Sequence, residues 1–182
     1  VFKSSTKQAL DNFYARPDTL SLGVCNGCQL MVELGLVGSE DPVHKAKMLH
    51  NASHKFESSF VNVTIPENKT VMLGNLTGQR LGVWVAHGEG KFVDINSPVT
   101  VPIYYTDHKG NISNKYPCNP NGSQRSAAAI VSSDGRHLAM MPHPERGVLT
   151  RANPYVPVDW RVSKYYPWRK MFLNAYEFCE NN

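Results

Sequence analysis

The sequence predicts an α/β fold in which a mixed sheet carries flanking helices, and three observations support this prediction. A short apolar stretch at 19–24 runs into a sharp turn at Cys25, and a segment with helical apolar spacing follows directly. Several later stretches alternate or run apolar in the manner of strands. Only one strand–turn–helix step is visible, whereas a doubly wound sheet needs several. We therefore expect a sheet that lacks its first strands, in a chain that begins within a domain.

The first predicted elements lie around this step. Apolar residues at positions 2, 10, 13 and 14 predict an amphipathic helix, which Arg16-Pro17-Asp18 ends. Residues 19–24 form the predicted strand, and Cys25 occupies the turn. A second helix is predicted from Asn26 onward, closed by the glycines at 35 and 38. Its apolar positions recur at helical spacing: Leu30, Met31, Leu34 and Val37.

The remainder of the chain is predicted to be rich in strands and to close with a helix. Alternating or continuous apolar residues predict strands at 56–63, 81–86, 101–106, 127–131 and 137–141. The last two flank Asp134-Gly135 and predict a hairpin. A dense turn cluster at 119–123 precedes them. The closing helix is predicted from a stripe of apolar residues: Trp168, Met171, Phe172, Ala175 and Phe178.

The composition excludes several classes of function. Of the 182 residues, 41% are hydrophobic and 19% are charged, which suits one globular domain. No apolar run approaches the length of a membrane span, about 18 residues. The net charge is +4, and the one tight basic group, Arg169-Lys170 beside Trp168, is expected on a solvated helix face. We therefore expect neither a membrane nor a nucleic acid as a partner.

The N-terminus and the cysteines favour a cytoplasmic protein. The first residues, VFKSSTKQAL, contain neither an initiator Met nor the apolar core of a signal peptide. Four cysteines are few for a chain of this size, so we expect reduced thiols. The number of N-x-S/T glycosylation acceptor sequences argues instead for a secreted protein, because it exceeds the roughly two that chance predicts. The sequence has six, at Asn51, Asn62, Asn68, Asn75, Asn111 and Asn121.

Cys25 is the candidate nucleophile. The stretch 23–27, GVCNG, is the cysteine counterpart of the G-x-S-x-G nucleophile elbow. In such an elbow the nucleophile sits in a strained turn, and both flanking glycines are expected to leave room where a Cβ would clash. The N–H groups at the helix start are expected to favour thiolate over thiol, and the Asn26 N–H to donate to an oxyanion.

Cys28 lies three residues further on, so two other uses of the pair stay open. A C-x-x-C at a helix start also suits a reversible thiol–disulfide protein. A zinc site would need a second pair of ligands, but Cys118 and Cys179 stand alone, without a histidine at ligand spacing. If Cys25 is the nucleophile, Cys28 falls one turn into the helix, where we expect a small buried residue.

A cysteine nucleophile requires a histidine, and His143 has the setting that best suits this role. His87 and His143 both end apolar strands, where sheets present functional groups. Pro142 and Pro144 restrict the backbone around His143, and Glu145 shares its face if the segment is extended. These residues predict a Cys–His–Glu triad, and the alternative is a plain surface turn. Of the other histidines, His44, His50 and His54 are expected at the surface, and His108 and His137 at turn or hairpin positions.

Five short strings in register give the chain a family resemblance. Residues 23–29 (GVCNGCQ) and 142–145 (PHPE) resemble the triad-type, or class I, glutamine amidotransferases. AHGEG at 86–90, NPNGS at 119–123 and MMPHPER at 140–146 narrow the resemblance. In this order and spacing they are similar to the C-terminal glutaminase domain of the phosphoribosylformylglycinamidine synthase family. The similarity covers nearly the whole chain, and it implies the flavodoxin-like sheet of class I glutamine amidotransferases.

The resemblance implies a role for each residue that matches a family motif. Cys25 would be the nucleophile, His143 the general base and acid, and Glu145 the carboxylate that orients the imidazole. Gln29 matches a contact to bound glutamine, and 87–89 a backbone edge that holds its amino-acid end. The implied substrate-binding set is Asn26, Gln29, His87, Gly88 and Glu89. No metal site is implied.

The same resemblance implies the reaction and its partners. Residues 1–182 would be a partial glutamine amidotransferase domain, the C-terminal part of a longer cytoplasmic enzyme that acts as a ligase. The domain would hydrolyse L-glutamine without a cofactor of its own. A synthetase region of the same polypeptide would use the ammonia, with ATP and Mg²⁺, to convert formylglycinamide ribonucleotide to formylglycinamidine ribonucleotide in purine biosynthesis. The second oxyanion donor would precede residue 1. The alternatives are the glutaminase domain of a different amidotransferase and a C-x-x-C redox protein.

Overall fold

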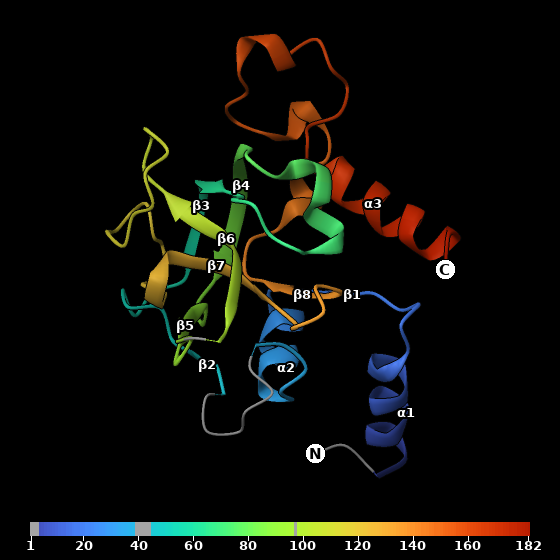
Figure 1. Cartoon of the computed structure of the whole chain (residues 1–182). Coiled ribbons are helices and arrows are strands. Elements are labelled where there is room, and N and C mark those ends of the chain that lie inside the picture. Colours follow the sequence, from blue (N-terminus) through green and yellow to red (C-terminus); the bar gives the residue numbers. More distant parts are fainter. Residues whose placement is uncertain (1–3, 39–44, 97) are drawn as a thin grey trace.

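The computed structural model describes residues 4–38, 45–96 and 98–182 (Figure 1). Its centre is a six-stranded sheet with the strand order β1-β8-β7-β6-β3-β4. β1 and β8 pair in parallel, and all other neighbouring strands are antiparallel. The sheet is therefore mixed, with one parallel step, as the sequence predicts. Its strands are β1 (Ser21–Val24), β3 (Glu57–Thr64), β4 (Arg80–His87), β6 (Thr100–Thr106), β7 (Ala127–Val131) and β8 (His137–Met140).

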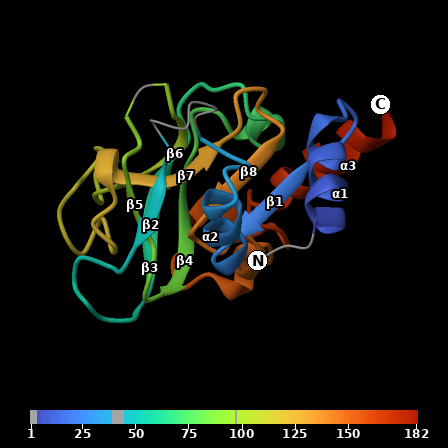
Figure 2. The ribbon, with the colours of Figure 1, turned by 90° about the horizontal axis from the view of Figure 1, so that it is seen from below.

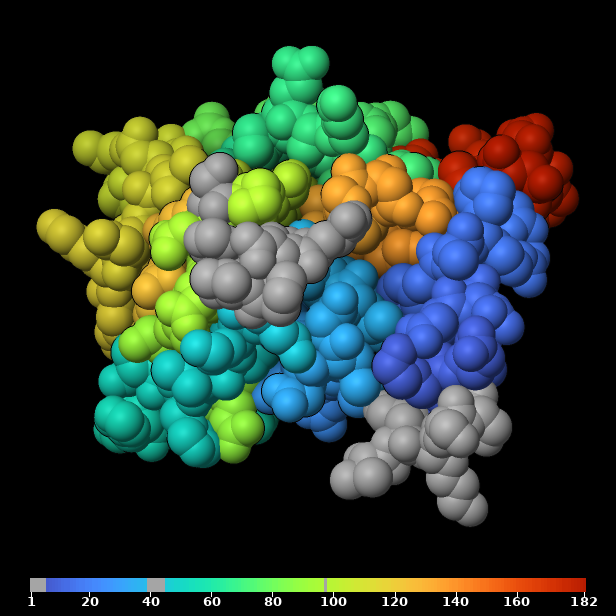
Figure 3. Space-filling model, turned by 60° about the horizontal axis from the view of Figure 1, so that its bottom comes forward, coloured from blue at the N-terminus to red at the C-terminus, as the bar shows by residue number. Residues whose placement is uncertain are grey.

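Helices cover both faces of this sheet. α2 lies on one face with the two-stranded ribbon β2–β5, and α3 lies on the other face (Figures 1 and 2). α1 stands beside β1 at the end of the sheet. In the space-filling view α2 forms part of the surface between α1 and the β2 region (Figure 3). The bounds are α1 (Ser4–Ala15), α2 (Asn26–Glu33), α3 (Arg169–Glu180), β2 (Lys47–Leu49) and β5 (Lys91–Val93).

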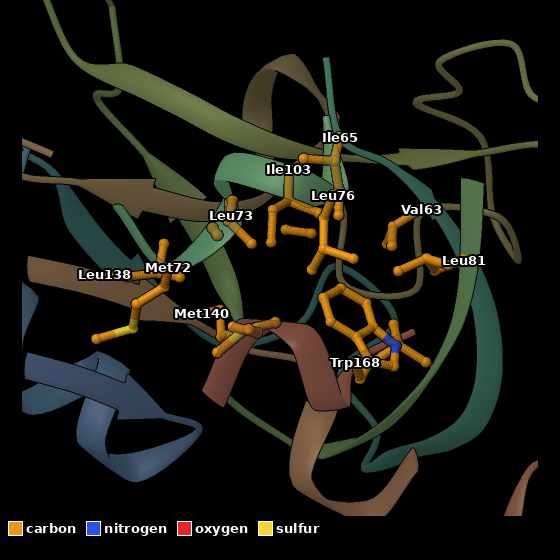
Figure 4. Close-up of a cluster of buried hydrophobic side chains, with 14 of the residues drawn as sticks. Val63, Ile65, Met72, Leu73, Leu76, Leu81, Ile103, Leu138, Met140 and Trp168 are labelled. Carbon is orange, nitrogen blue, oxygen red and sulfur yellow. The ribbon is translucent and has the colours of Figure 1, made fainter. Parts of the chain in front are cut away.

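A hydrophobic cluster between the sheet and α3 is built around Trp168. This side chain is fully buried, and its indole N–H donates to the carbonyl of Gly82 over 2.8 Å. Figure 4 shows it beside Leu81 and below Leu76, which belongs to the 3-10 helix Val71–Leu76. A second cluster lies on the α2 face and contains Cys28, Met31, Val32, Phe92 and Ile130. Together the clusters fix α2 and the strand that precedes it against β8.

Most of the predicted elements are confirmed, with small shifts at their ends. The second helix ends at Glu33, and Gly35 closes it as predicted, with a left-handed φ of 69°. Leu30, predicted in the apolar stripe, is 48% exposed. The buried residues of α2 are Cys28, Met31 and Val32. The predicted stripe is therefore confirmed for Met31 and wrong for Leu30, while Val37 is buried but lies beyond the end of the helix.

Other differences concern short elements. Phe56 was included in a predicted strand, but it precedes β3 and is 68% exposed. The three-residue strands β2 and β5 are too short to show a period in the sequence, and the 3-10 helix was also missed. Phe2 and His44, for which the sequence predicts a helix face and a surface position, lie outside the described residues. Within the described part of the chain, no helix is both long and apolar enough to cross a membrane.

Candidate active site

Cys25 occupies a strained turn between β1 and α2. Its φ of 53° and ψ of −107° place a non-glycine residue in a backbone region that L-residues rarely adopt. The Cys25 N–H donates to the carbonyl of Met140 in β8 over 3.0 Å, and its own carbonyl accepts the N–H of Gln29 over 3.1 Å. The turn is therefore held from both sides, by the parallel strand and by the first turn of α2.

Only one of the two glycines around Cys25 is required for space. A Cβ at Gly23 would meet the carbonyl oxygen of Gly27 at 2.6 Å and also the sulfur of Met31. A Cβ at Gly27 would meet nothing within 4 Å. The prediction that both glycines prevent a clash is confirmed for Gly23 and wrong for Gly27. The asymmetry arises because α2 passes directly over β1, so the strand glycine faces the helix backbone.

The Cys25 thiol is kept in its protonated form by its surroundings. Burial raises the pKa of Cys25, and the Asn26 N–H opposes this only in part. The thiol donates to the carbonyl of Ala86, with the sulfur 3.7 Å from the oxygen. The helix-start N–H lowers this pKa as expected, but desolvation outweighs it, so the resting site favours the thiol over the thiolate. The charges of Arg146 and Glu145 also act on the pKa of Cys25, in opposite directions.

His143 and Glu145 form the predicted pair. The Nδ1 atom of His143 lies 2.7 Å from Oε1 of Glu145, and His143 is only 7% exposed. The alternative of a plain surface turn is therefore wrong. The proton on Nδ1 satisfies the carboxylate, which leaves Nε2 as an acceptor. Nε2 is buried and has no hydrogen-bond partner among the described residues.

The outer strand β4 brings this pair to Cys25. The carbonyl of Trp84 accepts the N–H of His143 over 2.7 Å, and the carbonyl of Ala86 accepts the thiol of Cys25. Carbonyls two residues apart in a strand point to the same side and lie about 7 Å apart. Cys25 and His143 therefore bond to neighbouring carbonyls on one edge of β4, the edge that faces away from β3.

A cavity of about 370 Å³ opens beside Cys25. This volume is at the small end of ligand pockets. Besides Cys25 itself, its lining contains all five predicted substrate-binding residues: Asn26, Gln29, His87, Gly88 and Glu89. Phe56 and Ala86 complete the lining. The Gln29 amide donates to the carbonyl of Glu89 over 2.6 Å, so α2 is tied to residues 87–90, which we call the substrate loop.

His87 is neutral within this loop. It is 2% exposed, and burial lowers its pKa to about 4. Its Nδ1 lies 3.2 Å from Oδ1 of Asn51, and its Nε2 is buried without a partner in the described part of the chain. An imidazole in this state offers an acceptor rather than a positive charge.

Two functional candidates were missed by sequence reasoning. Asn51 and Asn121 are both fully buried and both bond to the substrate loop. In the sequence they stood out only as members of N-x-S/T acceptor sequences and, for Asn121, as part of the NPNGS string. No local pattern marks a buried amide whose partners are distant in the chain.

Cys28 does not share the setting of Cys25. It is fully buried in the cluster under α2, which confirms the prediction of a small buried residue, and burial raises its pKa well above the usual range. Both thiols are free. This burial gives no support to a reversible C-x-x-C pair. Among the remaining described histidines, His50 and His54 are exposed as expected, His108 lies in a turn, and His137 begins the hairpin strand β8, where it is buried.

Comparison with known proteins identifies close relatives. The chain is 42% identical to a phosphoribosylformylglycinamidine synthase of Dictyostelium discoideum and 44% identical to a probable one of Arabidopsis thaliana, over 99% of this chain in each case. It is 40% identical to the Homo sapiens protein of the same name over 91% of the chain. The chain spans only 14% of the length of each of these relatives.

Solved structures share the fold. One is titled "Structure of PurLQS from Thermotoga maritima" and matches with a TM-score of 0.68 and 24% identity, over 95% of this chain and 66% of that chain. A glutamine amido transferase from Methylobacillus flagellatus matches with a TM-score of 0.51 and 13% identity, over 97% and 68%. A model of the CobB/CobQ-like glutamine amidotransferase domain matches residues 1–179. The chain therefore belongs to the CobB/CobQ-like glutamine amidotransferase family.

Proposed function

We propose that this chain is a glutaminase domain that releases ammonia from L-glutamine through a thioester on Cys25. The observation that carries the proposal is that β4 holds Cys25 and the His143–Glu145 pair at neighbouring carbonyls of one edge, with a cavity of about 370 Å³ beside Cys25. Cysteine, histidine and carboxylate in this order supply nucleophile, base and orienting group. Membership in a glutamine amidotransferase family supports the same chemistry.

The first step is transfer of the Cys25 proton to His143. Because burial raises the pKa of Cys25, the thiol needs a base, and the unpartnered Nε2 of His143 is the acceptor available. The Cys25 side chain leaves the carbonyl of Ala86 and turns toward this nitrogen. Glu145 stabilises the imidazolium that forms, through its contact with Nδ1.

The thiolate then attacks the side-chain amide carbon of glutamine. A carbon–sulfur bond forms, and the negative charge on the amide oxygen is stabilised by the Asn26 N–H at the start of α2. His143 returns its proton to the nitrogen, the carbon–nitrogen bond breaks, and ammonia leaves. Water deprotonated by His143 next cleaves the thioester and gives glutamate. The sum is glutamine plus water to glutamate plus ammonia.

The remaining cavity residues would hold the amino-acid end of glutamine. Gly88 and Glu89 line the cavity, and the Gln29 side chain ties Glu89 to α2. The free Nε2 of His87 is an acceptor for an N–H group of the substrate. These assignments follow the substrate-binding set that the sequence resemblance implies.

We further propose that residues 1–182 form a partial domain at the C-terminal end of a longer, cytoplasmic polypeptide. The names of the relatives, each about seven times longer than this chain, support a role in phosphoribosylformylglycinamidine synthesis, a ligase reaction of purine biosynthesis. In that role the ammonia passes to a synthetase region of the same polypeptide. That region, outside this chain, would bind ATP and Mg²⁺ and convert formylglycinamide ribonucleotide to formylglycinamidine ribonucleotide.

The test is Cys25→Ala in the full-length polypeptide. Glutamine-dependent synthesis should be abolished, because the nucleophile is gone, while synthesis with added ammonium should be spared. Both rates are measured by product formation with saturating ATP. Equal loss of the two activities would remove Cys25 from the proposed role. Normal glutamine-dependent turnover would exclude the thioester route.

A further inference from the structure

The substrate loop is fastened by one buried asparagine. Asn51 is fully buried, and its Nδ2 donates to the carbonyl of His87 over 2.7 Å. Its Oδ1 accepts the N–H of Gly90 over 3.0 Å. Its backbone N–H donates to the carbonyl of Gly88 over 2.8 Å. Three of the four loop residues therefore bond to Asn51, although Asn51 does not line the cavity.

The same contacts fix the orientation of the Asn51 amide. Nδ2 also donates to the carbonyl of Lys55 over 2.9 Å, so both of its hydrogens point to carbonyl oxygens. Oδ1 must then face Gly90 and His87 as an acceptor. His87 consequently carries its hydrogen on Nδ1, and its Nε2 is left as an acceptor. Flipping the amide would set two hydrogens against the N–H of Gly90 and place an oxygen against two carbonyls.

A second buried amide closes the loop from the other side. Asn121 is fully buried, and its Nδ2 donates to the carbonyl of Gly90 over 2.7 Å. Its backbone carbonyl accepts the N–H of Ala52 over 3.0 Å, which links the turn at 119–123 to the residue after Asn51. The Ser123 hydroxyl donates to Oδ1 of Asn121 over 2.7 Å. Gly90 is thus held at its N–H by one asparagine and at its carbonyl by the other.

The loop is tightly packed where Gly90 passes the His87 ring. A Cβ at Gly90 would meet the His87 ring at 2.6 Å, so the two residues touch without room for adjustment. Glu89 lines the cavity and is exposed, and its carboxylate lies 3.4 Å from Nδ1 of His50 at the surface. The buried amides of Asn51 and Asn121 therefore hold the substrate loop from the interior, and residues 87–89 of the loop line the cavity.

We propose that Asn51, supported by Asn121, is a positioning residue for glutamine: it holds the substrate loop in its binding shape and fixes the tautomer of His87 without touching the substrate. The inference rests on the proposed function, because it assigns the loop to the amino-acid end of glutamine. Its consequence is selective. Loss of Asn51 should weaken recognition of glutamine and leave the chemistry of the Cys25 thiol unchanged.

The experiment compares two reagents that alkylate Cys25 in the full-length polypeptide. The diazoketone analogue of L-glutamine needs the substrate loop, whereas iodoacetamide has no amino-acid end and needs only an accessible sulfur. In Asn51→Ala the second-order rate with the glutamine analogue should fall about 10- to 100-fold, because buried partners in the loop are left unpaired. The rate with iodoacetamide should stay within about twofold. Peptide mass spectrometry identifies the labelled residue.

Asn62→Ala is the matched control. Asn62 also lies in an N-x-S/T sequence, but it is exposed on β3, away from the substrate loop. Both rates should equal those of the unaltered protein. Asn121→Ala should repeat the selectivity of Asn51→Ala to a smaller extent, since it removes one bond to the loop instead of three.

Each outcome decides the proposal. Equal slowing of both reagents in Asn51→Ala, or no slowing of either, overturns it. If Asn51→Ala does not fold, Asn51→Ser and Asn121→Ala are measured instead, and the absence of selectivity in both overturns it equally. If iodoacetamide labels Cys25 in the unaltered protein and the glutamine analogue does not, the proposed function itself has failed, which is a distinct result.

Discussion

The two sides of the cavity are built in different ways. On the catalytic side, Cys25 and His143 are placed by backbone: a strained turn and the carbonyls of β4. On the substrate side, the loop at 87–90 is placed by the side-chain amides of Asn51 and Asn121. The positions of the reacting groups are therefore set by the backbone, whereas the shape of the substrate loop is set by buried side-chain hydrogen bonds. Damage to the two sides should therefore appear in different kinetic constants.

Apart from loss of the nucleophile itself, the largest effect is expected from His143→Ala, which breaks the catalytic side alone. General acid–base catalysis contributes about 10²- to 10⁴-fold, so glutamine-dependent kcat should fall by that factor. KM for glutamine should change little, because the substrate loop is intact. Steady-state kinetics of the full-length polypeptide measure both constants, with ammonium-dependent synthesis as the internal control. A large rise in KM at unchanged kcat would show that His143 binds the substrate and does not take part in catalysis, contrary to this assignment.

The next prediction concerns stability. It tests whether the close approach of β1 to the backbone of α2 requires glycine at position 23. Gly23→Ala places a Cβ against the backbone of Gly27 and should lower the free energy of unfolding by about 1–3 kcal/mol. Gly27→Ala is the matched control. Its Cβ meets nothing within 4 Å, and alanine stabilises a helix by up to about 1 kcal/mol relative to glycine. The midpoint of urea unfolding should fall for Gly23→Ala and rise for Gly27→Ala, relative to the unaltered protein. Equal midpoints for the two variants would contradict the packing around Gly23.

A third variant sharpens the catalytic side. Glu145→Gln keeps the size of the side chain and removes the charge that faces Nδ1 of His143. We expect kcat to fall about 10- to 100-fold, less than the roughly 10⁴-fold loss when the buried aspartate of a serine protease is neutralised. The effect is smaller because the Glu145 side chain is 47% exposed, so water screens its charge. An unchanged kcat would leave His143 without an orienting partner.

The smallest effect is a shift in pH dependence. Burial raises the pKa of Cys25, so the neutral thiol is favoured and thiolate forms only at higher pH than in an ordinary cysteine. Alkylation by iodoacetamide should therefore rise with pH to a correspondingly high midpoint. Arg146→Ala should move the midpoint upward, since the Arg146 charge lowers this pKa, and Glu145→Gln should move it downward. Shifts in the same direction for both variants would contradict the electrostatic arrangement.

The sequence predicts the catalytic side well because its signals are local. Gly23 and Cys25 stand two residues apart, and the proline-flanked His143 stands two residues from Glu145. The α/β class, the single parallel step and the β7–β8 hairpin follow from equally local patterns. The raised pKa of Cys25 could not be predicted from the sequence, because desolvation depends on which distant parts of the chain pack around the sulfur.

The substrate side could be predicted only through resemblance. Asn51 bonds to His87 across 36 positions, and Asn121 bonds to Gly90 across 31. An asparagine in a polar stretch has the same appearance whether it is exposed or buried. Val37 was placed in the helical stripe for a related reason: it keeps the helical spacing, but it lies after the end of α2 and packs in the cluster that contains Ile130 of β7 and Ala139 of β8.

The burial of Asn51 and Asn121 has a practical consequence for producing this protein. Both side-chain nitrogens donate inside the fold, and both belong to motifs that oligosaccharyltransferase recognises in unfolded chains. In a secretory expression host, a glycan added during translocation would occupy the nitrogen before the native contact forms. Bacterial expression avoids this conflict, and an export signal fused to this chain would be expected to yield misfolded, sugar-bearing material.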